Sequence, residues 1–456
     1  MIDSREDCKY FTQSVAQMGE QQEVVACRAI FNSQGAKVVD KGVVINLGLY
    51  ERLMQHKLAA PLEDSIACAN GVGGEALKTA AASIMEDVPF FGRLAPDAPA
   101  RKRLLNVIET MPLPDAMAFQ LTVARDVRPE IYLNLIRTAL VAAWLAGRST
   151  LFSRFDLGMA ASAGMMHDIG ILHVDPALLH GSNQFSQEQR RQLYSHPLLS
   201  TTLVERHHQY PREVVRAVYE HHECLDGSGY PRNLSGDAIS PLGRTVALAQ
   251  VVAAMFASGR DAPELQLSVL LRMNDHRFDP TLSMQVLSLV QPQLDVMSAA
   301  IVLLDDSLSI LGEIDAILTQ LPLDLESEAA LTPERRDGMA LVADHGGNLR
   351  RALAGVGAVP QQLGLLGDAV NDQSVRIELT LLAGEASWQL RTLGREARRR
   401  WSNETAQDYP AVLQQWLERI DALVGQLAQI RSGAAADDLH NQMPVDTAAP
   451  VATPAV

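Results

Sequence analysis

Apolar residues recur every three to four positions over most of this chain, which predicts a mainly α-helical protein. From residue 115 to 295 the pattern is almost wholly helical. Polar segments with Gly, Pro, Asp or His mark loops at 173–176, 207–211 and 226–233. A second helical region follows at 296–432. We therefore expect a helical domain in the middle of the chain and a helical extension after it.

The N-terminal part departs from this helical pattern. Residues 23–31 and 36–45 resemble two strands, and the segment between them, 32–35, carries Asn and Gly as turns often do. Helical spacing resumes at 46–58. Residues 1–114 are thus expected to form a small α+β domain with a helical linker. The domain contains no cluster of catalytic residue types, which favours a sensory or docking role, and a purely structural extension is the alternative.

Two apolar stripes run through the C-terminal region with a near-heptad period. They comprise Leu304, Leu308, Leu311, Ile317 and Leu321, and then Leu413, Leu417, Ile420, Val424 and Leu427. Such stripes usually form the core of a helical bundle, and a homodimer seam between C-terminal helices is the alternative. Residues 433–456 are rich in Ala, Pro and small polar residues, so we expect a disordered tail.

Composition and charge narrow the function classes. The formal net charge of −15 and pI near 5.3 argue against a DNA- or RNA-binding protein, which needs a basic face. No apolar run approaches the ~20 residues of a membrane span, and the charged N-terminus does not resemble a signal peptide. The four cysteines lack CxxC spacing, as expected of reduced thiols in the cytoplasm.

Candidate chemistry is concentrated in the middle domain. Eight of the twelve histidines lie between residues 167 and 222. His167-Asp168 and His221-His222 are adjacent pairs, and His196 lies between them. Imidazole nitrogens with a carboxylate oxygen suit a divalent transition metal such as iron, manganese, zinc or nickel. The other four, His173, His180, His207 and His208, are expected to be surface or loop residues.

The surrounding motifs carry a family resemblance. HDIG (167–170), His-Pro (196–197), HHE (221–223) and DGSGYP (226–231) follow one another in the order typical of an HD-GYP domain. His196 follows His167 by 29 positions, in agreement with that pattern, and HRFDP (276–280) resembles its closing segment. About 170 residues are covered.

The resemblance implies a helical, metal-dependent phosphodiesterase domain of bacterial cyclic di-GMP signalling at residues 115–295. It also implies that the GYP loop contributes to nucleotide recognition and to contacts with diguanylate cyclase domains. The residues concerned are Asp226, Gly227, Gly229, Tyr230 and Pro231 of the loop, and Arg244, which falls where the family has an arginine.

Four positions depart from the family pattern. The upstream histidine ligand falls on Asn134 and the late aspartate ligand on Gln250, so two of the four ligands of one implied metal are missing. Two lysine positions are occupied by Ile171 and Gly181, which removes positive charge near the substrate phosphates. Glu130, one helical turn before Asn134, is a candidate compensating ligand.

The other implied metal keeps all its ligands, Asp168, His196, His221 and His222. We therefore expect one ion rather than two. The first hypothesis is a phosphodiesterase that hydrolyses cyclic di-GMP with this single ion. The second is an impaired homologue that acts as a cyclic di-GMP receptor or a protein-interaction adaptor, and the third is a hydrolase of another phosphate ester.

Overall fold

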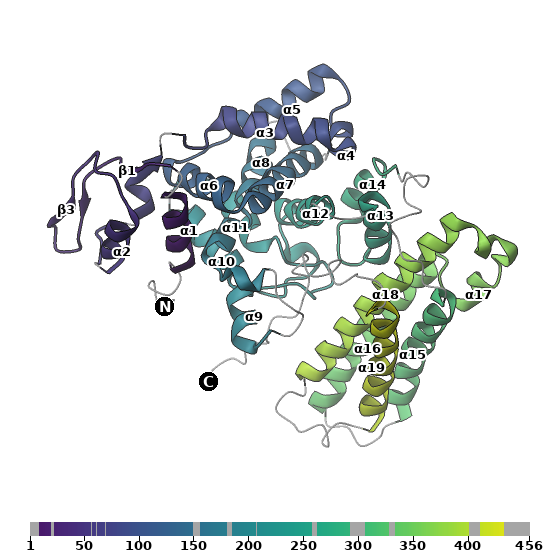
Figure 1. Cartoon of the computed structure of the whole chain (residues 1–456). Helices are drawn as coiled ribbons and strands as arrows, with labels where there is room; N and C mark the ends of the chain where they lie inside the picture. The colour runs from purple at the N-terminus through teal and green to yellow at the C-terminus, as the bar shows by residue number, and fades with distance from the viewer. Residues whose placement is uncertain are drawn as a thin grey trace. The chain divides into compact units, whose positions relative to one another are not determined.

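The computed structural model describes residues 9–432, apart from gaps at 20–21, 56, 61, 69, 149–155, 180–184, 207, 258–261, 292–305, 328–332 and 401–410. The fold is mainly α, as predicted, with a small β region near the N-terminus (Figure 1). The chain divides into two compact units, which meet in sequence at Ala257 and Ser258. The predicted tail, 433–456, lies outside the described residues.

Short strands and helices form the N-terminal region. They are α1 (Lys9–Gly19), β1 (Val24–Ala26), β2 (Ile30–Phe31), β3 (Lys37–Val39), α2 (Leu47–Gln55), the 3-10 helix η1 (Leu62–Asp64) and β4 (Ile66–Cys68). The predicted hairpin is present as the antiparallel pair β2–β3, with Gly35 in the turn at a φ of 79°. The first predicted strand, however, is broken after Ala26, and β1 pairs antiparallel with β4. The helical linker expected within residues 1–114 is present as helices from Gly74 onward, whereas Ile66–Cys68 before it is a strand.

Helix α1 packs against the middle domain of the same unit. The Phe11 ring stacks on the His173 ring at a centroid distance of 4.6 Å, and the Tyr10 hydroxyl donates to Asp175 at 3.0 Å. His173 ends the 3-10 helix η2 (Ile169–His173) and is only 7% exposed. The prediction that His173 lies on the surface was wrong, because α1 covers it.

The middle of the first unit consists of helices. They are α3 (Gly74–Asp87), α4 (Pro89–Arg93), α5 (Ala98–Thr110), α6 (Asp115–Val127), α7 (Pro129–Arg148), α8 (Asp156–Met166), η2, η3 (Pro176–Leu178), α9 (Gln187–Tyr194), α10 (His196–Arg206), α11 (Arg212–Glu220), η4 (Gly236–Ala238) and α12 (Pro241–Met255).

Helix α7 lies at the centre of this unit and packs against α8 and α12. Gly164 of α8 lies so close to the backbone of α7 that a Cβ at this position would be 2.9 Å from the Cα of Ala139. Gly147 faces Leu157 near the other end of the pair, so the two helices run antiparallel. If the alignment of the two helices continues in the same way, Asn134 of α7 lies level with the residues just after α8.

The second unit contains α13 (Pro263–Met273), α14 (Pro280–Leu287), α15 (Ser307–Ser327), α16 (Pro333–Gly355), α17 (Pro360–Leu363), η6 (Gly367–Asn371), α18 (Gln373–Arg400) and α19 (Ala411–Ser432). The four longest helices, α15, α16, α18 and α19, pack around one apolar core. Several stripe residues are buried in that core: Leu311, Ile317, Leu413, Leu417 and Ile420.

The bundle-core interpretation is therefore confirmed for these positions, but it was wrong for Leu308, which is exposed. Leu304 and the side chains of Leu321 and Leu427 lie outside the described part of the chain.

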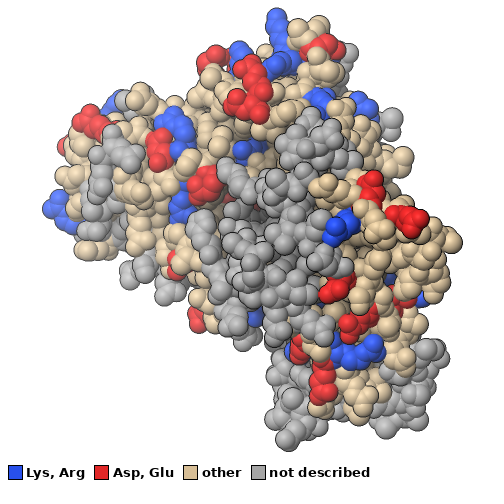
Figure 2. All heavy atoms as spheres, turned by 45° about the vertical axis from the view of Figure 1, so that its right-hand side comes forward, with Lys and Arg blue, Asp and Glu red and all other residues tan. Residues whose placement is uncertain are grey.

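Among the described residues, no helix is both long and apolar enough to cross a membrane. Among the described residues, Cys27, Cys68 and Cys224 are not joined in disulfides. On the face shown in Figure 2, the lysines and arginines of the described residues are interspersed with carboxylates.

Candidate metal centre

Helix ends deliver the histidines of the predicted metal site. His167 and Asp168 follow the last residue of α8. His196 begins α10, one residue beyond the end of α9, and His221 and His222 follow α11. The last carbonyls of a helix have no partner within the helix. A histidine placed just beyond such an end can therefore use its ring to satisfy one of them.

Three histidines use this arrangement. Nδ1 of His167 lies 2.8 Å from the Gly164 carbonyl oxygen. Nδ1 of His196 lies 2.7 Å from the Leu193 carbonyl oxygen, and Nδ1 of His221 lies 2.6 Å from that of Val218. Because a carbonyl oxygen only accepts, each Nδ1 carries a proton, and in the neutral ring Nε2 then presents a lone pair. A hydrogen bond from the other ring nitrogen to a carbonyl commonly orients a histidine that binds metal.

These lone pairs converge on the Asp168 carboxylate. Its Oδ1 lies 3.1 Å from Nε2 of His196 and 3.3 Å from Nε2 of His221, while its Oδ2 lies 3.1 Å from Nε2 of His167. The Nε2 atoms of His196 and His221 are 3.3 Å apart, and those of His196 and His222 are 3.0 Å apart. The ligand atoms of Asp168, His196, His221 and His222 all lie within 4.8 Å of one another.

A divalent transition metal fits this donor set. Ligands about 2.1 Å from one ion lie about 3.0 Å apart in octahedral and about 3.4 Å apart in tetrahedral coordination, close to the separations observed. Nε2 of His167 and Oδ1 of Asp168 are buried without a hydrogen-bond partner, although the other ring nitrogens lie close by. Buried acceptors without a donor are costly, and a cation among them satisfies them together.

The protonation states also suit a metal. Burial alone would raise the pKa of the Asp168 carboxyl, but His167, His196 and His221 outweigh it and hold that pKa well below its ordinary value. Burial lowers the pKa of His221 to about 4, against the opposing effect of Asp168. Burial, together with His221 and His196, also lowers the pKa of His222 well below its ordinary value. Near neutral pH the carboxylate is ionised and these two rings are neutral, as metal ligands must be.

The GYP loop packs against this cluster. The Tyr230 ring is fully buried and stacks on the His222 ring at a centroid distance of 4.5 Å, and the Tyr230 amide donates to the His222 carbonyl at 3.1 Å. A Cβ on Gly229 would lie 2.4 Å from that carbonyl, so only glycine fits there. Gly227 has a φ of 79°, a conformation that favours glycine. The loop thus fixes the plane of the His222 ring.

The other loop residues participate in local hydrogen bonds. Asp226 accepts from the Ser228 amide at 3.0 Å, and Pro231 follows a cis peptide bond. Arg244 donates to the Gly236 carbonyl at 2.9 Å and pairs with Asp237 at 2.8 Å.

Two buried carboxylates support the site, and the sequence interpretation did not single them out as site residues. Glu220 is 0% exposed and accepts from Arg216 at 2.7 Å, Arg232 at 2.9 Å and the Ser240 amide at 2.9 Å. It thereby joins the end of α11, the segment after the GYP loop and the start of α12. One signal was available, because Glu220 follows the buried Ala217 by three positions and so continues the buried face of α11.

Glu223 holds the same segment from the other side. Its two carboxylate oxygens accept from the Arg232 and Leu234 amides, each at 2.8 Å. Burial raises the pKa of this carboxyl, and the two amide donors partly oppose that shift.

The residues that differ from the HD-GYP family pattern lie in different surroundings. The Asn134 side-chain oxygen is buried and has no hydrogen-bond partner, whereas Glu130 is exposed. The Gln250 side-chain amide lies 2.6 Å from the His221 carbonyl and 3.2 Å from Nδ1 of His222. Ile171 is buried in η2, and Gly181 lies outside the described residues.

Three further histidines, His180, His207 and His208, were expected on the surface or in loops and not as metal ligands. His208 is exposed, and His180 and His207 fall in the gaps of the description.

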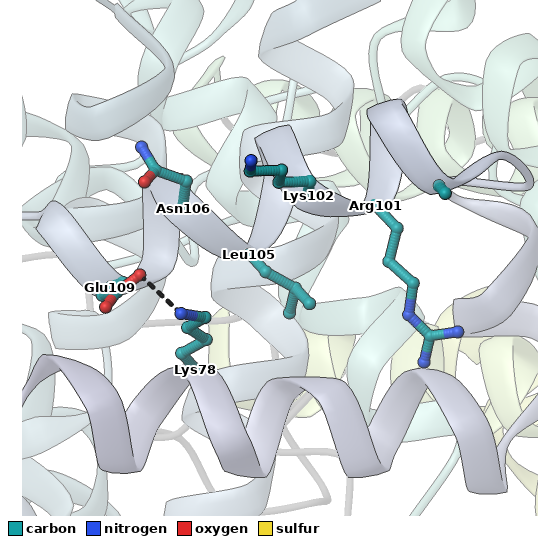
Figure 3. Close-up of a pocket in the computed structure, with 7 residues that line it drawn as sticks. Lys78, Arg101, Lys102, Leu105, Asn106 and Glu109 are labelled. Carbon is teal, nitrogen blue, oxygen red and sulfur yellow. Dashed lines mark ion pairs between the residues drawn. The ribbon is translucent and has the colours of Figure 1, made fainter.

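A separate groove of about 320 Å³ lies between α3 and α5 (Figure 3). Its basic residues are Lys78, Arg101 and Lys102. Lys78 pairs with Glu109 at 2.9 Å, and Arg101 pairs with Glu86 at 3.0 Å. Because the charges of Lys78 and Arg101 are compensated, the groove is a weaker candidate for binding a phosphate ester than the histidine cluster.

Comparison with known proteins agrees with the geometry of the cluster. The sequence model of one protein family, described as the HD domain, matches residues 136–282. The middle of this chain is an HD domain. The matched range includes every cluster residue and the GYP loop, and the HD domain belongs to the HD-GYP type of the HD superfamily.

The curated relatives of this HD domain are bacterial phosphodiesterases. A cyclic di-GMP phosphodiesterase of Vibrio cholerae is 25% identical over 169 residues, which are 35% of this chain and 34% of that protein. A 3'3'-cGAMP-specific phosphodiesterase of the same organism is 30% identical over 113 residues, 25% of this chain and 24% of that protein. A cyclic di-GMP phosphodiesterase of Pseudomonas aeruginosa is 30% identical over 126 residues, 26% of this chain and 30% of that protein. The chain thus spans about a quarter to a third of the length of these relatives.

Proposed function

We propose that this chain acts in cyclic-dinucleotide signalling as a metal-dependent phosphodiesterase with one ion, and that cyclic di-GMP is its substrate. The observation that carries the proposal is the convergence of three buried, correctly oriented imidazole nitrogens on the Asp168 carboxylate. The names of the curated relatives support a cyclic dinucleotide as the substrate class.

One ion would be held by Asp168, His196, His221 and His222. When bound, a divalent transition metal supplies hydroxide near neutral pH and stabilises negative charge on phosphoryl oxygens. The chain contributes the orientation of the ligands through the carbonyls at the helix ends. It also shields two of the four ligands from bulk solvent, because His196 and His221 are 0% exposed.

Slow turnover is part of the proposal. Asn134 and Gln250 stand where a second ion would need an imidazole and a carboxylate, and neutral amides bind a dication poorly. Ile171 adds no positive charge for the phosphates, and Arg244 is already paired with Asp237. The site therefore lacks much of the electrostatic stabilisation that phosphoryl transfer requires.

The alternative function is that of a cyclic di-GMP receptor or a protein adaptor. It is favoured by the same neutral residues, Asn134, Ile171 and Gln250, and by the helical C-terminal unit that the HD match does not cover beyond residue 282. Binding of diguanylate cyclase domains through the GYP loop and dimerisation through the C-terminal helices belong to this alternative.

Metal analysis and nucleotide turnover separate the two. The purified protein is analysed for bound metal by mass spectrometry, then incubated with manganese or ferrous iron and either cyclic di-GMP or 3'3'-cGAMP. We expect slow conversion to linear products, which His221→Ala abolishes and the exposed control His208→Ala retains. Nucleotide binding without turnover would favour the receptor. If the protein bound neither metal nor nucleotide, the phosphodiesterase and the receptor would both be wrong, and only the role of a protein adaptor would remain.

A further inference from the structure

Gln250 is a half-buried residue of α12 whose side chain touches two consecutive histidines. Its Nε2 atom lies 2.6 Å from the carbonyl oxygen of His221 and 3.2 Å from Nδ1 of His222. The two contacts come from a single amide group, so they fix its orientation together.

The His221 carbonyl decides which end of the amide faces it. A carbonyl oxygen only accepts, so the amide nitrogen must point at it; the reversed amide would place two oxygens 2.6 Å apart. The second hydrogen of the same nitrogen then points at Nδ1 of His222. That Nδ1 is therefore an acceptor.

His222 consequently has the opposite tautomer to its neighbours. In a neutral imidazole with Nδ1 unprotonated, Nε2 carries the proton. Nε2 of His222 lies 3.0 Å from Nε2 of His196, whose lone pair is available because its own Nδ1 donates to Leu193. The two contacts of the His222 ring thus agree: it accepts from Gln250 and donates to His196.

We propose that Gln250 is a positioning residue that holds His222 in the Nε2–H tautomer and so withholds the fourth ligand from a divalent transition metal. For His222 to bind the ion, its proton must move through solvent from Nε2 to Nδ1, and the hydrogen bond from Gln250 is lost. No other group gains or loses a proton. Gln250 thereby lowers the metal affinity of the site beyond the loss of a carboxylate.

The inference rests on the proposed metal function, but its first test does not need a metal. In the metal-free protein labelled with 15N-histidine, NMR distinguishes the two tautomers of each ring. We expect Nε2–H for His222 and Nδ1–H for His167, His196 and His221. An Nδ1–H signal for His222 in the wild type would overturn the inference.

Metal titration tests the consequence. Gln250→Leu removes the donor without supplying a ligand, so the switch of tautomer no longer breaks a hydrogen bond. We expect manganese or zinc to bind about 2–10-fold more tightly, the range of one neutral hydrogen bond. Gln250→Glu accepts from Nδ1–H and should tighten binding by about 10–100-fold.

A matched control separates this effect from general loosening of the fold. Gln120→Leu makes the same change at a buried position that faces His173 instead of the cluster, and we expect unchanged affinity. If Gln250→Leu bound no more tightly than the wild type, Gln250 would be only a missing ligand and the inference would be wrong. If no variant bound metal while His222 showed Nε2–H, the proposed function would fail and the tautomer assignment would stand.

Discussion

Glu220 is the side chain whose removal should most disturb the site without touching a ligand atom. One carboxylate oxygen accepts from Arg216 and Arg232, and the other accepts from the amide and hydroxyl of Ser240 at 2.9 and 2.6 Å. Glu220 immediately precedes His221, and Ser240 caps the helix that carries Gln250. Its loss should therefore reduce both stability and metal binding.

The magnitude follows from which partners are buried. Arg216 and Arg232 have side chains that are 53% and 42% exposed, so water replaces much of what they lose. The Ser240 amide and hydroxyl face the buried oxygen. Glu220→Gln can keep an acceptor toward Ser240 and should cost about 1–3 kcal/mol. Glu220→Ala removes every acceptor and leaves two donors of Ser240 unsatisfied, each at about 1–3 kcal/mol.

Thermal denaturation measures these losses. In a unit of this size each kcal/mol lowers Tm by about 2–4 °C. Glu213→Gln is the matched control, because Glu213 is exposed on the first turn of the same helix and should change stability by less than about 0.5 kcal/mol. If Glu220→Ala melted at the same temperature as Glu213→Gln, the role assigned to this carboxylate would be refuted. Metal content, measured on the same samples, should fall only in the Glu220 variants.

Two further predictions concern packing and thiol chemistry. Gly164→Ala should destabilise the protein by about 1–3 kcal/mol, because the new Cβ would meet α7 backbone at 2.9 Å. Gly158→Ala on the same helix has open space and should be neutral or stabilising by up to about 1 kcal/mol, so equal Tm values for the two variants would contradict the close approach. Burial, reinforced by Asp126, raises the pKa of Cys68 to about 11, so its thiolate fraction at pH 8 is only about 1 in 1,000. Mass spectrometry of native protein treated with iodoacetamide at pH 8 should show the exposed Cys27 modified well before Cys68; equal rates would show that Cys68 is not buried in solution.

The metal ligands could be predicted from sequence because they occur as short local motifs. His167-Asp168 and His221-His222 are adjacent pairs at helix ends, and the chain order of the motifs was enough to group them with His196. The helical regions were also predictable, because long segments show their apolar period clearly.

The errors have a common cause in contacts between residues distant in sequence. Strand β4 has three residues and pairs with β1, about forty positions earlier, so neither strand is long enough to show alternation. His173 was placed on the surface because nothing near it in sequence indicates that Phe11 covers its ring. The amide of Gln250 was considered only as a poor ligand, since its orientation depends on a carbonyl 29 residues away.

The contact between α1 and η2 matters for how the domain is isolated. A fragment that begins at residue 115 would retain Asp168 and every cluster histidine, yet it would lack Phe11 and Tyr10. The apolar face of His173 would then meet water only five residues from Asp168, and the turn between them would lose its cover. Weak metal binding by such a fragment would therefore be a result of the truncation and not a property of the metal site. The activities of variants are best compared in the full chain.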